Sequence, residues 1–167
     1  MVFILGSQRK DVGNVVAAFK EYQRYLEHYR DRFPASAWAL ATSDWYFDFA
    51  NQRCPHDGSL QWIKIEELEG GEEPGDKLVS IKTRLRSAHG NGWIEFHYPR
   101  VYSYRLALFS DYNYGSRHGH ADWLYDEFRW AGEGRVMHEI EWARTDDTAH
   151  WFIEASDVVY RWTYSAK

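Results

Sequence analysis

The stretch that decides the fold is LYDEFRWAGEGRVMHEIEW, residues 124–142. Alternating apolar and polar residues flank a glycine-rich centre, a pattern typical of two antiparallel strands joined by a tight turn. Taking residues 132–134 as the loop, with Gly134 in the left-handed conformation, predicts that Phe128 faces His138. The same register predicts the pairs Trp130 with Val136, Leu124 with Trp142, Glu127 with Glu139, and Tyr125 with Glu141. One side of this hairpin is therefore apolar and the other is charged.

The period of two extends through the rest of residues 60–165, with short connections between the alternating segments. Another hairpin is predicted with Gly90 and Asn91 as a two-residue loop. Its register places Arg86 opposite Glu95, Leu85 opposite Phe96 and Arg84 opposite His97. Short connections favour antiparallel pairing, so we expect a twisted, mostly antiparallel sheet of seven to eight strands over residues 60–165.

The first part of the chain has a helical period instead. Apolar residues form one stripe from residue 12 onward, at Val15, Val16, Phe19, Tyr22, Leu26 and Tyr29. Trp38, Ala41, Trp45 and Phe49 predict a second helix or two short ones. The apolar face of the sheet needs cover, and these helices can supply it. We therefore expect a single α+β domain over residues 1–167, with a helical part at 8–50 packed on one face of the sheet.

The composition of the chain limits the classes of function to be considered. The 167 residues are 44% hydrophobic and 18% aromatic, with a net charge of −5 and one cysteine. No apolar run is long enough for a transmembrane helix, and a single cysteine cannot form an intramolecular disulfide, so a cytoplasmic location is expected. The net charge disfavours nucleic acid as a partner, although Lys82, Arg84 and Arg86 form a basic row. Motifs for nucleotide, flavin or serine-hydrolase chemistry are absent from the sequence, and no cofactor is predicted.

The pair Glu127 and Glu139 is the most informative candidate site, because like charges directly across a ladder destabilise it. Three explanations are open. Arg129 or Arg161 could bridge the two carboxylates, a cationic partner could neutralise them, or they could act as a catalytic acid and base.

A second candidate is His118-x-His120-x-Asp122, since imidazole and carboxylate groups at alternate positions are suitable ligands for a divalent metal. The spacing resembles part of the metallo-β-lactamase signature. That family has histidine after the aspartate, where this chain has Trp123, and too few residues follow for the second half of its fold. The family is therefore excluded, and a metal site outside it would need a further ligand such as His97 or His138. Otherwise these residues belong to a polar loop suited to contacts.

The sequence thus favours a non-catalytic protein-binding module whose partner is another protein with a basic surface. In size and charge the chain is similar to bacterial immunity proteins, which occlude a toxin. The expected contact surface is the open charged face of the sheet with the loop at residues 111–120, and its residues are Tyr112, Tyr114, Arg117, Tyr125, Glu127, Arg129, Glu139 and Glu141. One alternative is a small-ligand-binding protein with an aromatic-lined cavity, and another is a metal-dependent hydrolase using His118, His120 and Asp122. A homo-oligomer is also allowed.

Overall fold

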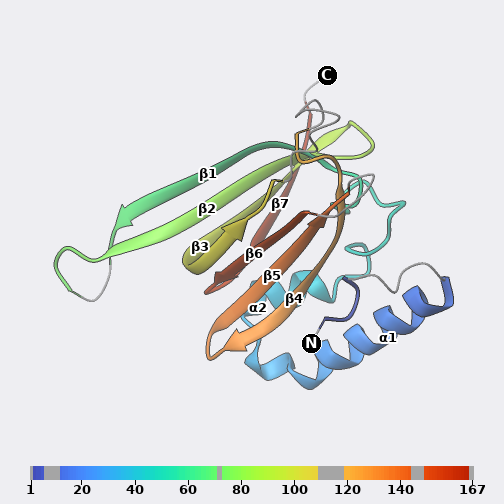
Figure 1. Cartoon of the computed structure of the whole chain (residues 1–167), viewed down its shortest axis with the longest axis horizontal. Helices are drawn as coiled ribbons and strands as arrows, with labels where there is room; N and C mark the ends of the chain where they lie inside the picture. Colours follow the sequence, from blue (N-terminus) through green and yellow to red (C-terminus); the bar gives the residue numbers. More distant parts are fainter. Residues whose placement is uncertain (1, 6–11, 71–72, 109–118, 144–148, 166–167) are drawn as a thin grey trace.

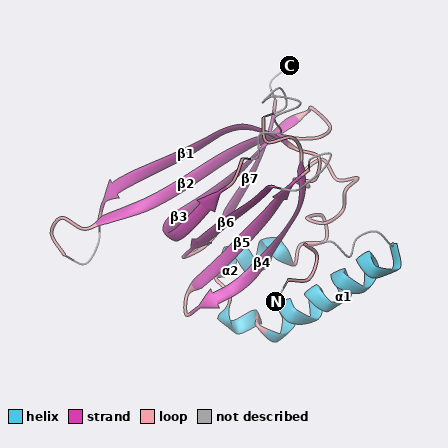
Figure 2. Ribbon diagram, viewed as in Figure 1, coloured by secondary structure: helices cyan, strands magenta, loops and turns pink. Residues whose placement is uncertain are grey.

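The structure is a computed structural model that describes residues 2–5, 12–70, 73–108, 119–143 and 149–165 (Figure 1). Two helices come first, α1 (Val12–His28) and α2 (Ala35–Ala41), with a short 3-10 helix at Arg30–Arg32 between them. The strands are β1 (Ser59–Glu69), β2 (Lys77–Arg86), β3 (Gly92–Leu106), β4 (Trp123–Gly132), β5 (Arg135–Trp142), β6 (Ala149–Ala155) and β7 (Val159–Tyr164). Helices precede strands without alternating with them, so the chain is α+β, as predicted (Figure 2).

The seven strands form one antiparallel sheet with the order β1-β2-β3-β6-β5-β4, and β7 also pairs with β3. β3 is long enough to pair with two strands, one after the other, along the same edge. Its first half, from Gly92 to His97, pairs with β7, and its second half, from Val101 to Leu106, pairs with β6. The free ends of β1 and β2 extend beyond the other strands as an arm (Figure 1).

The central hairpin forms largely as predicted. Phe128 lies opposite His138 and Glu127 lies opposite Glu139, and Gly134 has a φ of +62°. The predicted pairing of Leu124 with Trp142 is wrong. Trp123 faces Trp142 instead, because the register shifts between Trp123 and Tyr125.

The register predicted for the β2–β3 hairpin is wrong by two residues. Arg84, not Arg86, lies opposite Glu95, and Ser87 donates its backbone N–H to the carbonyl of Gly92 over 3.1 Å. The loop therefore has four residues instead of two. A shift of two residues leaves every side chain on its expected face, so the alternation of apolar residues does not distinguish the two registers.

Helix α1 lies along the outer edge of β4 and supplies it with hydrogen bonds. The Tyr22 hydroxyl donates to the carbonyl oxygen of Phe128 over 3.0 Å and accepts from the N–H of Phe128 over 2.6 Å. The Tyr25 hydroxyl accepts from the N–H of Trp130 over 2.8 Å. These hydroxyls satisfy backbone groups that an edge strand otherwise leaves open to pairing.

Helix α2 covers the apolar face of the sheet, where the core is strongly aromatic. Trp142 packs against Trp151 with ring centroids 4.8 Å apart, and both side chains are fully buried. The carboxylate of Asp157 caps α2 by accepting from the N–H of Ala37 over 2.9 Å, which satisfies one of the free amides of the first turn. In the described part of the chain, no helix has both the length and the apolar character to span a membrane.

Helix α2 is shorter than the apolar stripe suggests. The hydroxyls of Thr42 and Ser43 donate to the carbonyls of Trp38 and Leu40 over 2.8 and 2.7 Å, which occupies acceptors at the end of the helix. The following residues, including Phe49, form turns instead of a second helix. This turned segment runs beside α1 and creates the cleft described next.

Candidate functional site

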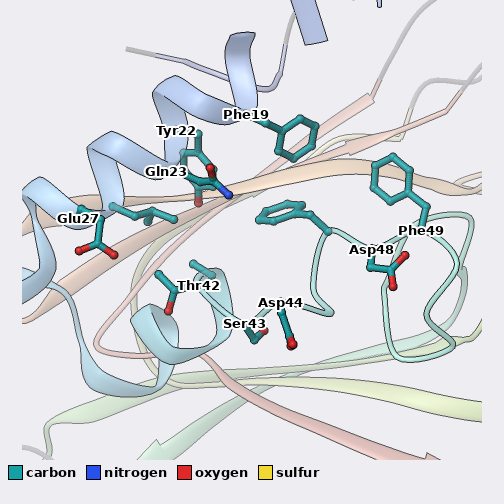
Figure 3. A pocket seen from close by; sticks show the side chains of 12 residues that line it. Phe19, Tyr22, Gln23, Glu27, Thr42, Ser43, Asp44, Asp48 and Phe49 are labelled. Atoms are coloured by element: carbon teal, nitrogen blue, oxygen red, sulfur yellow. The ribbon is translucent and has the colours of Figure 1, made fainter. Parts of the chain in front are cut away.

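A cleft of about 640 Å³ opens between α1 and the turned segment after α2 (Figure 3). Its apolar lining comes from Phe19, Tyr22 and Leu26 of α1, together with Phe47 and Phe49. Tyr22 and Leu26 are buried, whereas Phe49 is 41% exposed, so the apolar surface runs from the core to the mouth. The rings of Phe19 and Phe47 meet edge to face, with centroids 5.3 Å apart. Hydrophobic and aromatic walls of this extent are typical of sites for small organic ligands.

The rim of this helical cleft is polar and acidic. Glu27, Asp44 and Asp48 are exposed, and each contributes to the lining (Figure 3). Among the described residues that line the cleft, none is lysine, arginine or histidine. Carboxylates at the mouth of an apolar cleft favour a ligand that combines a cationic group with an apolar body, because a charge pair at ~4 Å contributes about 1–4 kcal/mol in solvated surroundings.

A buried ionic cluster lies on the other face of the sheet. It consists of Glu127, Arg129, Glu139 and His150. The Arg129 guanidinium bridges the two glutamates, with 2.5 Å between Nη1 and Oε1 of Glu127 and a second ion pair to Glu139. His150 Nδ1 lies 3.1 Å from Oε1 of Glu139. Of the three explanations left open for the opposed glutamates, a bridging arginine is the one observed, and it is Arg129 and not Arg161.

The two bridged carboxylates have pKa shifts of opposite sign. Burial raises the pKa of Glu127, and the backbone amides of Ile4 and Phe3 together with Arg129 offset this only in part. Burial also acts to raise the pKa of Glu139, but hydrogen bonds from His150 and Arg129 outweigh it and lower the pKa overall. Glu127 is buried more completely than Glu139, so the cost of burial prevails at Glu127, whereas the hydrogen bonds and nearby positive charge prevail at Glu139.

The expectation that these carboxylates lie on an open face is wrong. The exposed fractions of Glu127, Glu139 and Glu141 are 0%, 5% and 1%. The backbone N–H groups of Phe3 and Ile4 donate to Oε2 of Glu127 over 3.0 and 2.9 Å, so the amino-terminal segment lies against this carboxylate. Sequence alternation predicts which face a side chain takes, but not which distant segment covers that face.

Other residues of the expected contact surface are placed only in part. Tyr125 and Arg129 are half-buried. Tyr112, Tyr114 and Arg117 lie outside the described residues. A role for this surface in binding a partner therefore stays a prediction.

The predicted metal triad is also described only in part. His118 lies outside the described residues. His120 packs its ring against Trp142 and Trp151, with centroid distances of 5.5 and 5.0 Å, and Asp122 is exposed. Within the described ranges, no group of three or more His, Cys, Asp or Glu side chains could hold a metal ion. Metal binding by the triad itself stays a prediction.

A buried polar network that the sequence did not single out centres on Asp126. Its carboxylate accepts hydrogen bonds from the Tyr46 hydroxyl over 2.7 Å and the Trp123 indole N–H over 2.9 Å, and it lies 2.9 Å from His138 Nε2. His138 Nδ1 lies 2.8 Å from the Tyr98 hydroxyl. The sequence signal was the position of Asp126, which shares a strand face with Phe128 and therefore points into the core. Since all five side chains are buried, the network orders the core and offers no access for a substrate.

The described side chains thus include the open helical cleft and two buried polar arrangements, and a second open hollow of about 610 Å³ is lined by Gln52, Asn91 and Trp162 among others. Comparisons of this chain with protein-family models, with curated proteins and with solved structures found no match.

Proposed function

We propose that the protein is a non-catalytic binding protein whose helical cleft takes an amphipathic organic cation. The observation that carries the proposal is the pairing of an aromatic floor with a carboxylate rim in a cleft of about 640 Å³. That volume lies within the range of roughly 300–1,000 Å³ that small-molecule sites occupy. The apolar body of the ligand would contact Phe19, Phe47 and Phe49, and its cationic group would face Glu27, Asp44 and Asp48.

Two features support a cation over a neutral or anionic ligand. The described rim contains three carboxylates and no basic side chain, and the protein carries a net charge of −5. An aromatic lining also attracts organic cations through the negative faces of the rings, by about 0.5–2 kcal/mol for each well-placed contact. Both the acidic rim and the aromatic lining disfavour an anion, which would face the carboxylates without a counter-charge.

The test uses phenethylammonium as a probe, with phenethyl alcohol as its uncharged match, in amide NMR titrations of the whole chain. We expect phenethylammonium to shift the signals of residues 41–49, with a Kd on the order of 1 mM, as befits a fragment of this size. The alcohol should bind several-fold more weakly. Equal binding of the two probes, or shifts confined to residues outside the cleft, would contradict the proposal.

Substitutions at the rim test whether its carboxylates cause the preference for a cation. The double substitution of Asp44→Asn with Asp48→Asn should weaken binding of phenethylammonium about fivefold to tenfold, or about 1–1.4 kcal/mol, and leave binding of the alcohol unchanged. Glu21→Gln removes an exposed charge from α1 that does not line the cleft, so it serves as the matched control. A loss of the same size in Glu21→Gln would point to net charge instead of a site.

A second candidate is recognition of a protein with a basic surface, as in an inhibitor or immunity protein. The exposed acidic rim beside Phe49 favours it, because a basic side chain of a partner could enter the cleft from outside. Tyr125, whose ring centroid lies 5.8 Å from that of Phe49, would then extend the contact. Under this candidate, Asp44→Lys should slow association with a partner recovered from the native host, mainly at low salt. An unchanged association rate would remove the rim from that contact.

A further inference from the structure

The arm formed by β1 and β2 carries a surface that neither the cleft nor the core uses. Trp62, Ile65 and Leu68 of β1 are 37%, 41% and 44% exposed. Three large apolar side chains within seven consecutive positions of one strand are thus partly exposed to solvent. β1 begins the strand order and, apart from a single bridge between Ser59 and Asp122, pairs only with β2 among the described residues. Its outer edge therefore offers unpaired backbone donors and acceptors beside apolar side chains.

From this edge we infer that the protein forms a two-fold symmetric dimer in which β1 pairs antiparallel with β1 of a second copy. The two-fold axis would be perpendicular to the sheet and would pass beside Ile65, so that Ile65 of one copy faces Ile65 of the other. Such an edge contact is isologous, with the same strand used by both copies. It would extend the sheet across the pair without burying the helical cleft, because the cleft is lined by α1 and the segment after α2, and both helices lie away from the arm (Figure 1).

The charges on β1 select this register. With Ile65 on the axis, Lys64 faces Glu66 of the second copy, and Trp62 faces Leu68, each twice by symmetry. Lys64 and Glu66 already lie close within one chain, with 2.7 Å between Nζ and Oε1, so both point to the same face of the strand. Moving the axis by one residue would oppose two copies of Lys64 or of Glu66, and opposed like charges destabilise a ladder. Only the register centred on Ile65 pairs Lys64 with Glu66 and Trp62 with Leu68 across the two copies.

Disulfide trapping tests both the dimer and its register. In Ile65→Cys the two new thiols face each other across the axis, at a separation that a disulfide can bridge. In Glu67→Cys the two thiols would lie about 13 Å apart along the strands, since residue 67 faces residue 63 of the second copy. We expect mild oxidation to cross-link Ile65→Cys into a covalent dimer and to leave Glu67→Cys without a disulfide between copies. Cys54 is buried and present in both variants, so it does not distinguish them. Cross-linking at 67 but not at 65 would overturn the register.

Charge exchange tests the pairing without a covalent bond. Sedimentation velocity of the unaltered chain should show a monomer–dimer equilibrium at concentrations up to about 1 mM, and Lys64→Glu should raise the dimer Kd about tenfold. Adding Glu66→Lys to that variant restores opposite charges across the axis and should recover most of the affinity. Ile65→Lys places two like charges on the axis and should leave only monomer. A monomeric unaltered chain over the whole range, or a Lys64→Glu dimer that Glu66→Lys weakens further, would overturn the proposal.

Discussion

The hydroxyl of Tyr22 both donates to and accepts from the backbone of Phe128, at 3.0 and 2.6 Å, so that one side chain satisfies two groups on the edge of β4. Tyr22→Phe removes this hydroxyl and leaves a buried N–H and a buried carbonyl without a partner. We expect the free energy of unfolding to fall by about 2–4 kcal/mol, at roughly 1–3 kcal/mol for each buried group. Urea denaturation measures this loss.

Tyr25→Phe is the matched comparison for Tyr22→Phe. The Tyr25 hydroxyl accepts from Trp130 at a half-buried position, where water can replace it. Its loss should therefore cost about 1 kcal/mol. Losses of about 1 kcal/mol in both variants would show that water reaches both positions on the edge of β4.

The Asp126 network predicts a second stability effect. Asp126→Asn places an amide group where the carboxylate accepts from Tyr46 and Trp123 and contacts His138. Because an amide offers only one acceptor oxygen, we expect a loss of about 3 kcal/mol. Tyr46→Phe removes one donor from the same network and should cost roughly 1–1.5 kcal/mol by the same reasoning. A larger loss in Tyr46→Phe than in Asp126→Asn would place the important contact elsewhere.

Glu139 predicts the direction of a pH effect. Its pKa is lowered in the folded protein, so the folded state binds this proton more weakly than the unfolded chain does. The resulting stability is present above the unfolded pKa of about 4.3 and is lost as the pH falls through the lower folded value. Glu139→Gln should therefore flatten the loss of stability between about pH 5 and pH 3. The exposed Glu133→Gln is the control, and its profile should follow that of the unaltered chain.

Glu127 should act in the opposite direction. Burial raises its pKa, so its contribution to stability is complete below the unfolded pKa and is lost as the pH rises through the folded value. The difference in stability between Glu127→Gln and the unaltered chain should consequently shift in favour of the variant as the pH rises from about 4 to 7. Thermal denaturation at a series of pH values measures both glutamates, and parallel profiles for the two variants would contradict the assigned shifts.

Gly92 predicts a packing effect at the pairing of β3 with β7. A Cβ atom there would lie 2.3 Å from the ring of Trp162 and 2.7 Å from the carbonyl oxygen of Thr163. Gly92→Ala should therefore cost about 2–3 kcal/mol through overpacking. Gly134→Ala meets nothing within 4 Å but keeps a φ of +62°, and its cost should be about 1 kcal/mol. Tryptophan fluorescence during urea denaturation reads both variants, and a milder effect at Gly92 would mean that Trp162 moves aside easily.

The sequence predicts the fold where neighbouring constraints agree. At the central hairpin, alternation and the turn glycines both indicate that Phe128 faces His138, and the structure confirms it. At the β2–β3 hairpin the loop length was the single guide, and a two-residue error placed Arg86 instead of Arg84 opposite Glu95. Strand periodicity cannot correct such an error, because both registers bury the same side chains.

The site was harder to predict because its parts are distant in sequence. The cleft depends on the end of α2 at Ala41, which hydroxyl groups of Thr42 and Ser43 help to set, although the apolar stripe runs on to Phe49. The burial of Glu127 depends on Phe3 and Ile4, more than a hundred residues away. Such contacts form only in the assembled sheet, so a local sequence pattern does not predict them.

The tyrosines of α1 have a consequence for how far assembly can proceed. An antiparallel sheet with two open ends can add copies without limit and grow into a fibre. Here the β4 end of the strand order is closed by Tyr22 and Tyr25, so a copy that joins through β1 presents a sealed edge on its far side. The symmetric β1 contact closes at a pair, and further growth through β4 would require displacing both tyrosine hydroxyls from its backbone amides.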